Sequence, residues 1–357
     1  MADDIESCTV DPQSDPAARA EIKALLEACD LSYEPTIEAF VTLRRGRNLI
    51  ACAGLDKNIV KCAAIAPAEQ GESLSLTLMT EIAHLAHARG HNHLFLYTRP
   101  DNVDRFRACG FYKLVEVPGI AAFMENTPIG MRGYCAQLAA LRQPGEAIGA
   151  IVMNANPFTF GHRHLVEYAI GHCDWLHLFV VAEDSSFIAY RDRLAMIRAG
   201  VADLPRLTVH PGSEYMVSRA TFSSYFFKEK NAAADCFTAV DLLLFRNFIA
   251  PALRSTRRFG GTEPFCTTTR KYNADMKDWL QRPDPSFPPV EVVEIPRRTH
   301  DEVPISASEV RRLLTAEQFG RIGRLVPPFT PPLLREKYRP GRTPSQIPDP
   351  VPRVDAL

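Results

Sequence analysis

The stretch IGAIVMNANPFTFGHRHLVEYAI, Ile148–Ile170, decides the fold of the C-terminal half of the chain. Its first six residues, Ile148–Met153, are apolar and partly β-branched, which predicts a buried parallel strand. The polar residues and the proline of Asn154–Pro157 end that strand. Apolar residues then recur at helical spacing from Leu165 onward, so the stretch predicts a strand, a sharp turn and a helix.

A turn of this kind suits a phosphate group, because a helix N-terminus offers free N–H groups and a partial positive charge. Gly161 lets a ligand approach the backbone, His162 can donate a ring N–H, and Thr159 can donate its hydroxyl. Asn156 and Phe158, in the same turn, are further candidates for binding a nucleotide. The alternative interpretation is a glycine turn beside a histidine of the core.

The turn resembles the T/H-x-G-H signature of the nucleotidyltransferase superfamily, which grips ATP phosphates during attack at the α-phosphorus. The fuller pattern here, N-P-F-T-x-G-H between a strand and a helix, is more specific than the tetrapeptide alone. Repeated strand-then-helix units follow it, with strands expected at Leu176–Ala182 and Leu207–His210. They predict a doubly wound parallel sheet of the α/β class, with ligands at the carboxyl ends of its strands.

A second helix start lies at Pro304–Arg311, PISASEVR. Ser306 is placed as an N-cap, and Glu309 three residues later predicts a capping box. A well-capped ordinary helix is one interpretation. The stretch also resembles I-S-x-S/T-x-x-R, the second signature of the same superfamily, which implies that Ser306, Ser308 and Arg311 contact the β- and γ-phosphates.

Charge arithmetic favours further cations at this site. A triphosphate carries about four negative charges, whereas a helix end offers about half a positive one. Arg311, a basic residue such as Lys228 or Arg219, and Mg²⁺ are the expected remainder. Lys228 and Arg219 are equally explained as solvated surface charges.

The composition limits the class of protein. The chain has 357 residues, enough for two or three domains, and a net charge of −1, so no basic field recruits nucleic acid. We expect no membrane span and a cytoplasmic location, since no apolar run is long enough to cross a bilayer and the start, MADDIESC, is not a signal peptide. The nine cysteines are scattered without a C-x-x-C pair, so neither a disulfide framework nor a protein metal site is predicted.

The N-terminal half reads as β-β-β-α-β-α. With NVDRFRACGFYKL (Asn102–Leu114) it resembles the acyl-CoA N-acetyltransferase (GNAT) fold. In that family the loop before the long helix holds the pyrophosphate of coenzyme A, and the corresponding Gln70–Ser73 has one glycine and one acidic residue. Two roles for this domain remain open: it is either retained for docking or prosthetic-group binding, or it is catalytic.

We therefore expect a flexible N-terminus over 1–17, a GNAT-like domain over 18–142, a linker over 143–146, a nucleotidyltransferase-like domain over 147–334, and an irregular proline-rich tail over 335–357.

Taken together, residues 20–330 resemble the citrate lyase ligase family. The segments that carry the resemblance include CAGLDKNIVKCAAIAP (52–67), SRATFSSYFFKE (218–229) and GTEPFCTTTRKYNADM (261–276). The resemblance implies a ligase that uses ATP and Mg²⁺ to activate acetate as acetyl-AMP. The acetyl group then goes to the thiol of a phosphoribosyl-dephospho-coenzyme A group on the acyl-carrier subunit of citrate lyase.

In this hypothesis Thr159 and His162 stabilise the α- and β-phosphates, and Gly261, Thr262 and Glu263 lie near the adenosine or the acetate. Three rival functions remain: an enzyme resembling phosphopantetheine adenylyltransferase, a protein acetyltransferase that uses acetyl-CoA, and a non-catalytic module that docks a carrier protein.

Overall fold

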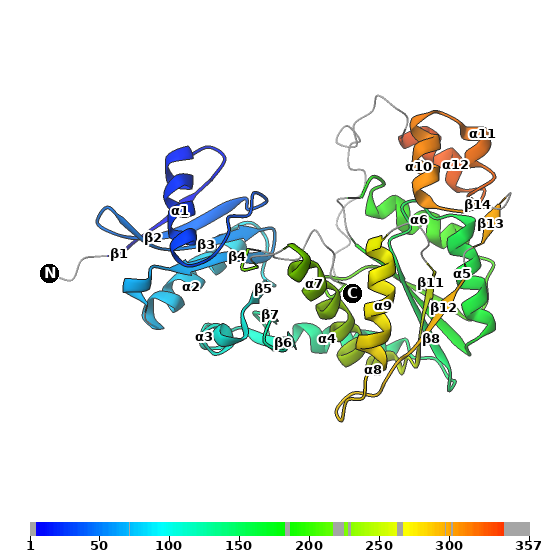
Figure 1. Ribbon diagram of the computed structural model, residues 1–357, viewed down its shortest axis with the longest axis horizontal. Coiled ribbons are helices and arrows are strands. Elements are labelled where there is room, and N and C mark those ends of the chain that lie inside the picture. The colour runs from blue at the N-terminus through cyan, green and yellow to red at the C-terminus, as the bar shows by residue number, and fades with distance from the viewer. Residues whose placement is uncertain are drawn as a thin grey trace. The chain divides into compact units, whose positions relative to one another are not determined.

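The computed structural model describes residues 5–70, 72–182, 186–216, 225–227, 230–262, 267–296, 298–300 and 303–338. The chain divides into two compact units, whose elements are labelled in Figure 1. Unit 1 comprises 1–142, 217–253 and 278–289. Unit 2 comprises 143–216, 254–277 and 290–357.

Unit 1 is built on a seven-stranded mixed sheet in the order β1-β2-β3-β4-β5-β7-β6. Its strands are β1 (Ile5–Val10), β2 (Ala39–Arg45), β3 (Asn48–Asp56), β4 (Ile59–Ile65), β5 (Phe95–Thr98), β6 (Tyr112–Val117) and β7 (Ala121–Glu125). Gly46 and Lys57 have positive φ angles of 59° and 54° in the tight turns that join β2, β3 and β4. Strands β4 and β5 are the parallel pair, and their register covers only Ile59↔Phe95 and Val60↔Leu96.

The helices of the unit pack in part against this sheet and in part against one another. They are α1 (Pro16–Ala28), α2 (Glu72–Ala88), α3 (Val103–Ala108), α4 (Gly130–Ala140), α7 (Lys230–Leu244) and α8 (Ala250–Leu253), with short 3₁₀ turns at Pro67–Glu69 and Pro100–Asn102. The Asp15 side chain caps α1 by accepting from the Ala18 N–H at 2.9 Å, and Pro16 occupies the first turn. Leu78 and Ile82 of α2 are buried in the main apolar cluster of the unit.

Helix α7 continues through a π-helical turn, Phe245–Ile249, into α8, and together they form one long helical segment. Its apolar part is Ala233–Leu253. It is long and apolar enough to cross a membrane, so the expectation that no run has that length is wrong. However, 78% of its apolar window is buried inside the protein, which is typical of a core helix. The buried Arg246 on this helix donates to the carbonyls of Trp279, Arg282 and Phe287 at 2.7–2.9 Å, and so holds the 278–289 segment to unit 1.

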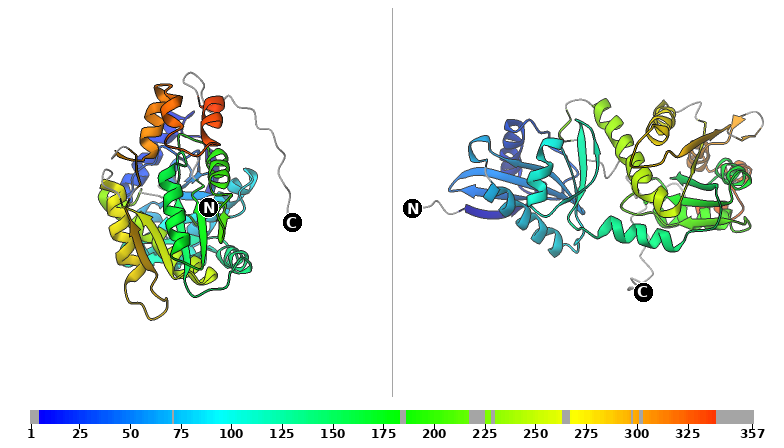
Figure 2. Two further views of the ribbon diagram at one scale, coloured as in Figure 1. Left: turned by 90° about the vertical axis from the view of Figure 1, so that its right-hand side faces the viewer. Right: turned by 90° about the horizontal axis from the view of Figure 1, so that it is seen from below.

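Unit 2 contains a five-stranded parallel sheet in the order β10-β9-β8-β11-β12, and a small hairpin. The strands are β8 (Ile148–Met153), β9 (Trp175–Val180), β10 (Leu207–His210), β11 (Arg257–Gly261) and β12 (Glu291–Ile295), with β13 (Thr299–His300) and β14 (Val303–Pro304) forming the hairpin. The helices are α5 (Phe160–Gly171), α6 (Tyr190–Gly200), α9 (Thr267–Gln281), α10 (Ala307–Thr315), α11 (Phe319–Ile322) and α12 (Thr330–Lys337). Helices α10, α11 and α12 gather in one group (Figure 2). The predicted α/β class is confirmed, with a mixed N-terminal sheet and a parallel C-terminal one.

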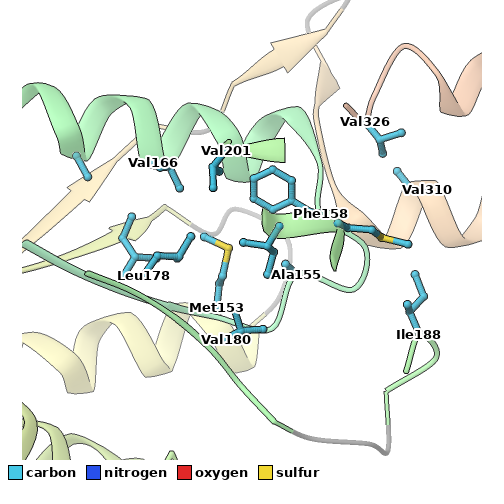
Figure 3. Close-up of a cluster of buried hydrophobic side chains, with 14 of the residues drawn as sticks. Met153, Ala155, Phe158, Val166, Leu178, Val180, Ile188, Val201, Val310 and Val326 are labelled. Atoms are coloured by element: carbon cyan, nitrogen blue, oxygen red, sulfur yellow. The ribbon is translucent and has the colours of Figure 1, made fainter. Parts of the chain in front are cut away.

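The core of unit 2 joins the sheet to the helices on one face. Leu178 and Val180 of β9 pack with Val166 of α5 and Ile197 of α6, so both helices cover the same face. Figure 3 shows the Phe158 ring within this cluster, near Ala155 and Val201. In sheets of this kind ligands bind at the carboxyl ends of the strands, so we expect the site where β8 ends and α5 begins.

Three expected boundaries differ from the structure. Residues 5–10 of the expected flexible N-terminus form β1, which pairs with β2 through its backbone although its side chains are mostly exposed. Segments 217–253 and 278–289 of the expected second domain belong to unit 1. The expected tail begins inside α12, and Tyr338 is buried with 7% of its surface exposed.

Candidate functional site

The N-terminus of α5 is fixed by Thr159. Its side chain accepts from the His162 N–H, and in return the His162 ring accepts from the Thr159 N–H, which completes a capping box. Thr159 is only 1% exposed, and its hydroxyl lies 2.9 Å from His162 Nδ1. The hydroxyl therefore helps to position the helix and the histidine. That it also donates to phosphate stays a prediction.

The capping box also determines which nitrogen of His162 carries the proton. Nδ1 accepts from the Thr159 backbone N–H at 3.0 Å, so in the neutral ring the hydrogen is on Nε2. The ring stacks on Phe158 at a centroid distance of 5.7 Å. The geometry thus fixes both the orientation of the His162 ring and its tautomer.

Phe158 itself belongs to the core rather than to a nucleotide site. It is fully buried, and a Cβ added to Gly200 of α6 would lie 2.5 Å from its ring. The prediction that Phe158 binds the cofactor is therefore corrected, since the aromatic ring supports the turn from below.

Asn156 holds the strand-to-helix turn to a neighbouring loop. Its side-chain oxygen accepts from the Ile188 N–H at 3.0 Å. The buried Arg193 of α6 donates to the backbone and side-chain oxygens of Asn154 at 2.8 and 2.6 Å. Both asparagines therefore hold the turn in place. Nucleotide binding by Asn156 stays a prediction.

Helix α10 begins as predicted at Ser306, whose hydroxyl accepts from the Glu309 N–H at 3.1 Å. The reciprocal half of the expected capping box is absent among the hydrogen bonds of this helix, since the Glu309 carboxylate pairs with Arg312 at 2.7 Å on both oxygens. Ile305 and Val310 are buried, whereas Ser308 is exposed in the first turn.

The two signature helices meet. A Cβ on Gly161 would lie 3.2 Å from the carbonyl oxygen of Ile305, just ahead of α10. The Arg311 guanidinium of α10 donates to the Asn156 carbonyl in the turn before α5. Burial lowers the pKa of Arg311, yet an arginine remains charged at neutral pH. The close approach at Gly161 is thus made by the chain itself, and it brings the N-termini of α5 and α10 together.

The remaining predicted residues divide into two groups. Gly261 and Thr262 end β11 at the same edge of the sheet; the Gly261 carbonyl accepts from Asn273 at 2.9 Å, and the Thr262 N–H donates to Ile295 at 2.9 Å. Glu263 and Lys228, like Arg219, lie outside the described residues.

Sequence reasoning missed a network that supports this site from the C-terminal end of the chain. The Tyr338 hydroxyl donates to the buried carboxylate of Asp192 at 2.7 Å and accepts from the Ala189 N–H at 3.0 Å. Lys337 also contacts Asp192 at 2.7 Å. No local pattern signals this contact, because its partners lie about 146 positions apart.

A buried histidine pair lies on the opposite face of the sheet from α5. His177 Nδ1 and His210 Nε2 are 2.8 Å apart on the neighbouring strands β9 and β10. Burial lowers the pKa of each from 6.5 to about 4, so both rings are neutral at physiological pH.

Unit 1 contains a cavity of about 1020 Å³ where β4 and β5 diverge. Its wall contains Ala63–Ile65 of β4, residues of α2 such as Leu76, and two arginines, Arg99 and Arg105. Tyr225 closes one side, and its hydroxyl donates to the Tyr97 carbonyl at 2.9 Å. Gln70 of the 70–73 loop lines the cavity, while Gly71 lies outside the described residues.

The parallel sheet, with two capped helix N-termini converging at its carboxyl edge, defines an α/β protein in which that edge is suited to an anionic ligand. The family "Citrate lyase ligase C-terminal domain" matches residues 148–333. The chain belongs to the citrate lyase ligase family. It is 51% identical over 311 residues to "[Citrate [pro-3S]-lyase] ligase" of Escherichia coli K12, covering 87% of this chain and 88% of that one. It is 46% identical over 316 residues to the protein of the same name from Klebsiella pneumoniae, covering 88% and 92%.

Solved structures are similar to parts of the chain. Escherichia coli ElaA matches 35% of this chain and 100% of its own, with 14% identity and a TM-score of 0.31. A putative nicotinate-nucleotide adenylyltransferase from Vibrio parahaemolyticus matches 54% of this chain and 93% of its own, with 14% identity and a TM-score of 0.31. The predicted family is thus confirmed by the relatives, and membership of a ligase family implies the use of ATP.

Proposed function

We propose that this protein activates citrate lyase by acetylating it at the expense of ATP, in the cytoplasm. Acetate and ATP·Mg²⁺ form acetyl-AMP and pyrophosphate. The acetyl group then passes to the thiol of the phosphoribosyl-dephospho-coenzyme A group on the acyl-carrier subunit. The observation that carries the first step is the meeting of α5 and α10, seen at Gly161 and Ile305 and at Arg311 and Asn156.

The residues of this site supply positioning and charge rather than a nucleophile. The acetate oxygen attacks the α-phosphorus as its bond to pyrophosphate breaks, and acetate is already ionised at neutral pH, so no general base is required. His162 Nε2–H donates to the α/β-phosphates, while Thr159 holds its ring. Ser306, Ser308, Arg311 and the N–H groups of α10 receive the charge of the leaving pyrophosphate.

Mg²⁺ fits this proposal as a companion of the triphosphate. No three His, Cys, Asp or Glu side chains gather as ligands within the described ranges. The proposal therefore has the phosphates supply most of the ligands, as Mg²⁺ usually requires, and the metal neutralises their charge.

In the second step the acceptor thiol, as its thiolate, attacks the acetyl carbonyl carbon and AMP leaves with the electron pair of the broken bond. We propose the cavity of unit 1 as a site for the prosthetic-group arm. Beyond Val60 strand β4 has no register with β5, and an extended chain of amides can pair with such an open strand edge. The arginines at positions 99 and 105 in its wall suit phosphate groups.

The first experiment is ATP–pyrophosphate exchange with purified protein and Mg²⁺, with and without acetate and the carrier subunit. Exchange that requires acetate supports acetyl-AMP formation. Exchange that requires phosphopantetheine instead assigns the protein to the metabolite-adenylating class. Acetyl transfer from acetyl-CoA without ATP would support the acetyltransferase alternative.

The variant that tests the site is His162→Ala. Removing a donor to a developing anionic charge typically lowers kcat about 10²- to 10³-fold. His172→Ala is the matched control, because His172 caps the other end of the same helix. Full exchange activity in His162→Ala would refute the role given to His162.

A further inference from the structure

Unit 2 contains an exposed arginine, Arg298, that has no carboxylate partner among the residues that the structure describes. The guanidinium of Arg298 makes no hydrogen bond or ion pair with any described residue, and its side chain is exposed. The guanidinium lies over the Phe160 ring, whose centroid is 6.0 Å from Arg298 Cζ. Its backbone is held, because the Arg298 carbonyl accepts from the Ile305 N–H at 3.0 Å.

Those two contacts place Arg298 beside both signature helices. Phe160 is the first residue of α5, and Ile305 leads into Ser306, the cap of α10. Each helix start contributes about half a positive charge. Arg311, whose described partner is the uncharged Asn156 carbonyl, adds a full charge nearby. Without an anion, this gathering of like charge is unfavourable.

Other arginines of unit 2 are arranged differently. Arg163 pairs with Asp203 at 2.7 Å, Arg257 with Glu291 at 2.8 Å, and Arg312 with Glu309 at 2.7 Å. These three arginines have carboxylate partners, whereas Arg298 and Arg311 have none within the described part of the chain.

We propose that Arg298 binds the β- and γ-phosphates of ATP and the pyrophosphate that leaves, a role that rests on the proposed adenylation. Its carbonyl is bonded next to the α10 cap, so the guanidinium serves the β/γ end rather than the nucleoside end. Two helix ends, Arg298 and Arg311 together supply about three positive charges against about four on the triphosphate, and Mg²⁺ supplies the rest. The Phe160 ring orients the guanidinium plane and leaves its N–H edge for phosphate oxygens.

The test is calorimetric titration of the full chain with ATP, pyrophosphate and AMP, each with Mg²⁺ and without acetate. In Arg298→Gln we expect the Kd of ATP and of pyrophosphate to rise at least tenfold, while the Kd of AMP changes less than twofold. Arg298→Lys keeps the charge but not the fork, and should recover part of the loss for both ligands. Arg254→Gln is the matched control, because Arg254 precedes β11 at the opposite edge of the sheet, and it should bind all three ligands normally.

Unchanged pyrophosphate affinity in Arg298→Gln would overturn the proposal, and so would an equal loss for AMP, which would place the residue at the nucleoside end. If Arg298→Gln does not fold, Arg298→Lys and Phe160→Leu make the same comparison of pyrophosphate with AMP. Failure of the adenylation itself is distinguishable, because a protein that binds ATP and pyrophosphate but shows no acetate-dependent exchange would refute the reaction and leave this binding role intact.

Discussion

Acidification should destabilise this protein through the pair His177 and His210. Both rings are buried and neutral, with pKa values lowered from 6.5 to about 4. In the unfolded chain each histidine recovers a pKa of about 6.5. As the pH falls below 6.5, these histidines are protonated in the unfolded state but stay neutral in the folded state. The free energy of unfolding therefore decreases progressively until the pH reaches about 4.

The size of the loss follows from those values. At pH 5.5 an unfolded histidine is about ten-to-one protonated, which favours unfolding by about 1.4 kcal/mol for each ring, or about 3 kcal/mol for the pair. A pH of 5.5 lies well above the folded value, so the folded rings take up few protons. Four carboxylates at or near the surface have pKa values lowered by hydrogen bonds or by arginine, and they stay ionised across this range: Asp11, Asp174, Asp203 and Glu309.

Urea unfolding followed by circular dichroism at pH 7.5 and pH 5.5 gives the difference in free energy of unfolding. The double variant His177→Leu/His210→Phe should reduce the difference to below about 1 kcal/mol, because it removes both titrating groups. His84→Gln, a change at an exposed helix position, should leave the difference unchanged. A wild-type protein equally stable at the two pH values, or a double variant that loses as much as wild type, would show that the buried pair is not the cause.

Three further changes test the packing. Gly200→Ala should cost about 1–3 kcal/mol in urea unfolding, because its Cβ meets the Phe158 ring at 2.5 Å; wild-type stability would contradict that contact. Tyr338→Phe removes the hydroxyl that donates to buried Asp192, and should cost about 1.5–3 kcal/mol, whereas an unchanged midpoint would show that the hydrogen bond adds nothing. Lys61→Met leaves the carboxylates of Glu34 and Asp56 without their buried cation and should cost about 3–5 kcal/mol in urea unfolding at pH 7; wild-type stability would contradict the importance of these ion pairs.

The local parts of the fold were predictable from sequence. The β8 strand, the α5 start at Thr159 and the α10 cap at Ser306 each depend on residues within a few positions, so their patterns are legible in the chain. Parallel pairing followed from the alternation of strands and helices.

Long-range features were not predictable. Phe158 was predicted to contact a ligand because it lies within a signature. In the structure its ring is buried against Gly200 of α6, and no local sequence pattern indicates that contact. Strand β1 was missed because an edge strand with exposed side chains lacks hydrophobic alternation. Arg298 lay outside both signatures, and only the fold brings it to Phe160.

The path of the chain through the two units has a consequence for dividing the protein. The chain passes from one unit to the other after Arg142, Met216, Leu253, Lys277 and Pro289. A fragment that ends at Arg142 lacks α7 and the buried Arg246 of the turn that follows it. A fragment that begins at Gln143 carries those apolar segments without the unit 1 sheet on which α7 packs. Neither half is therefore a self-contained folding unit, and a single nick in a connecting loop, which leaves all the pieces together, should be tolerated far better than removing either half.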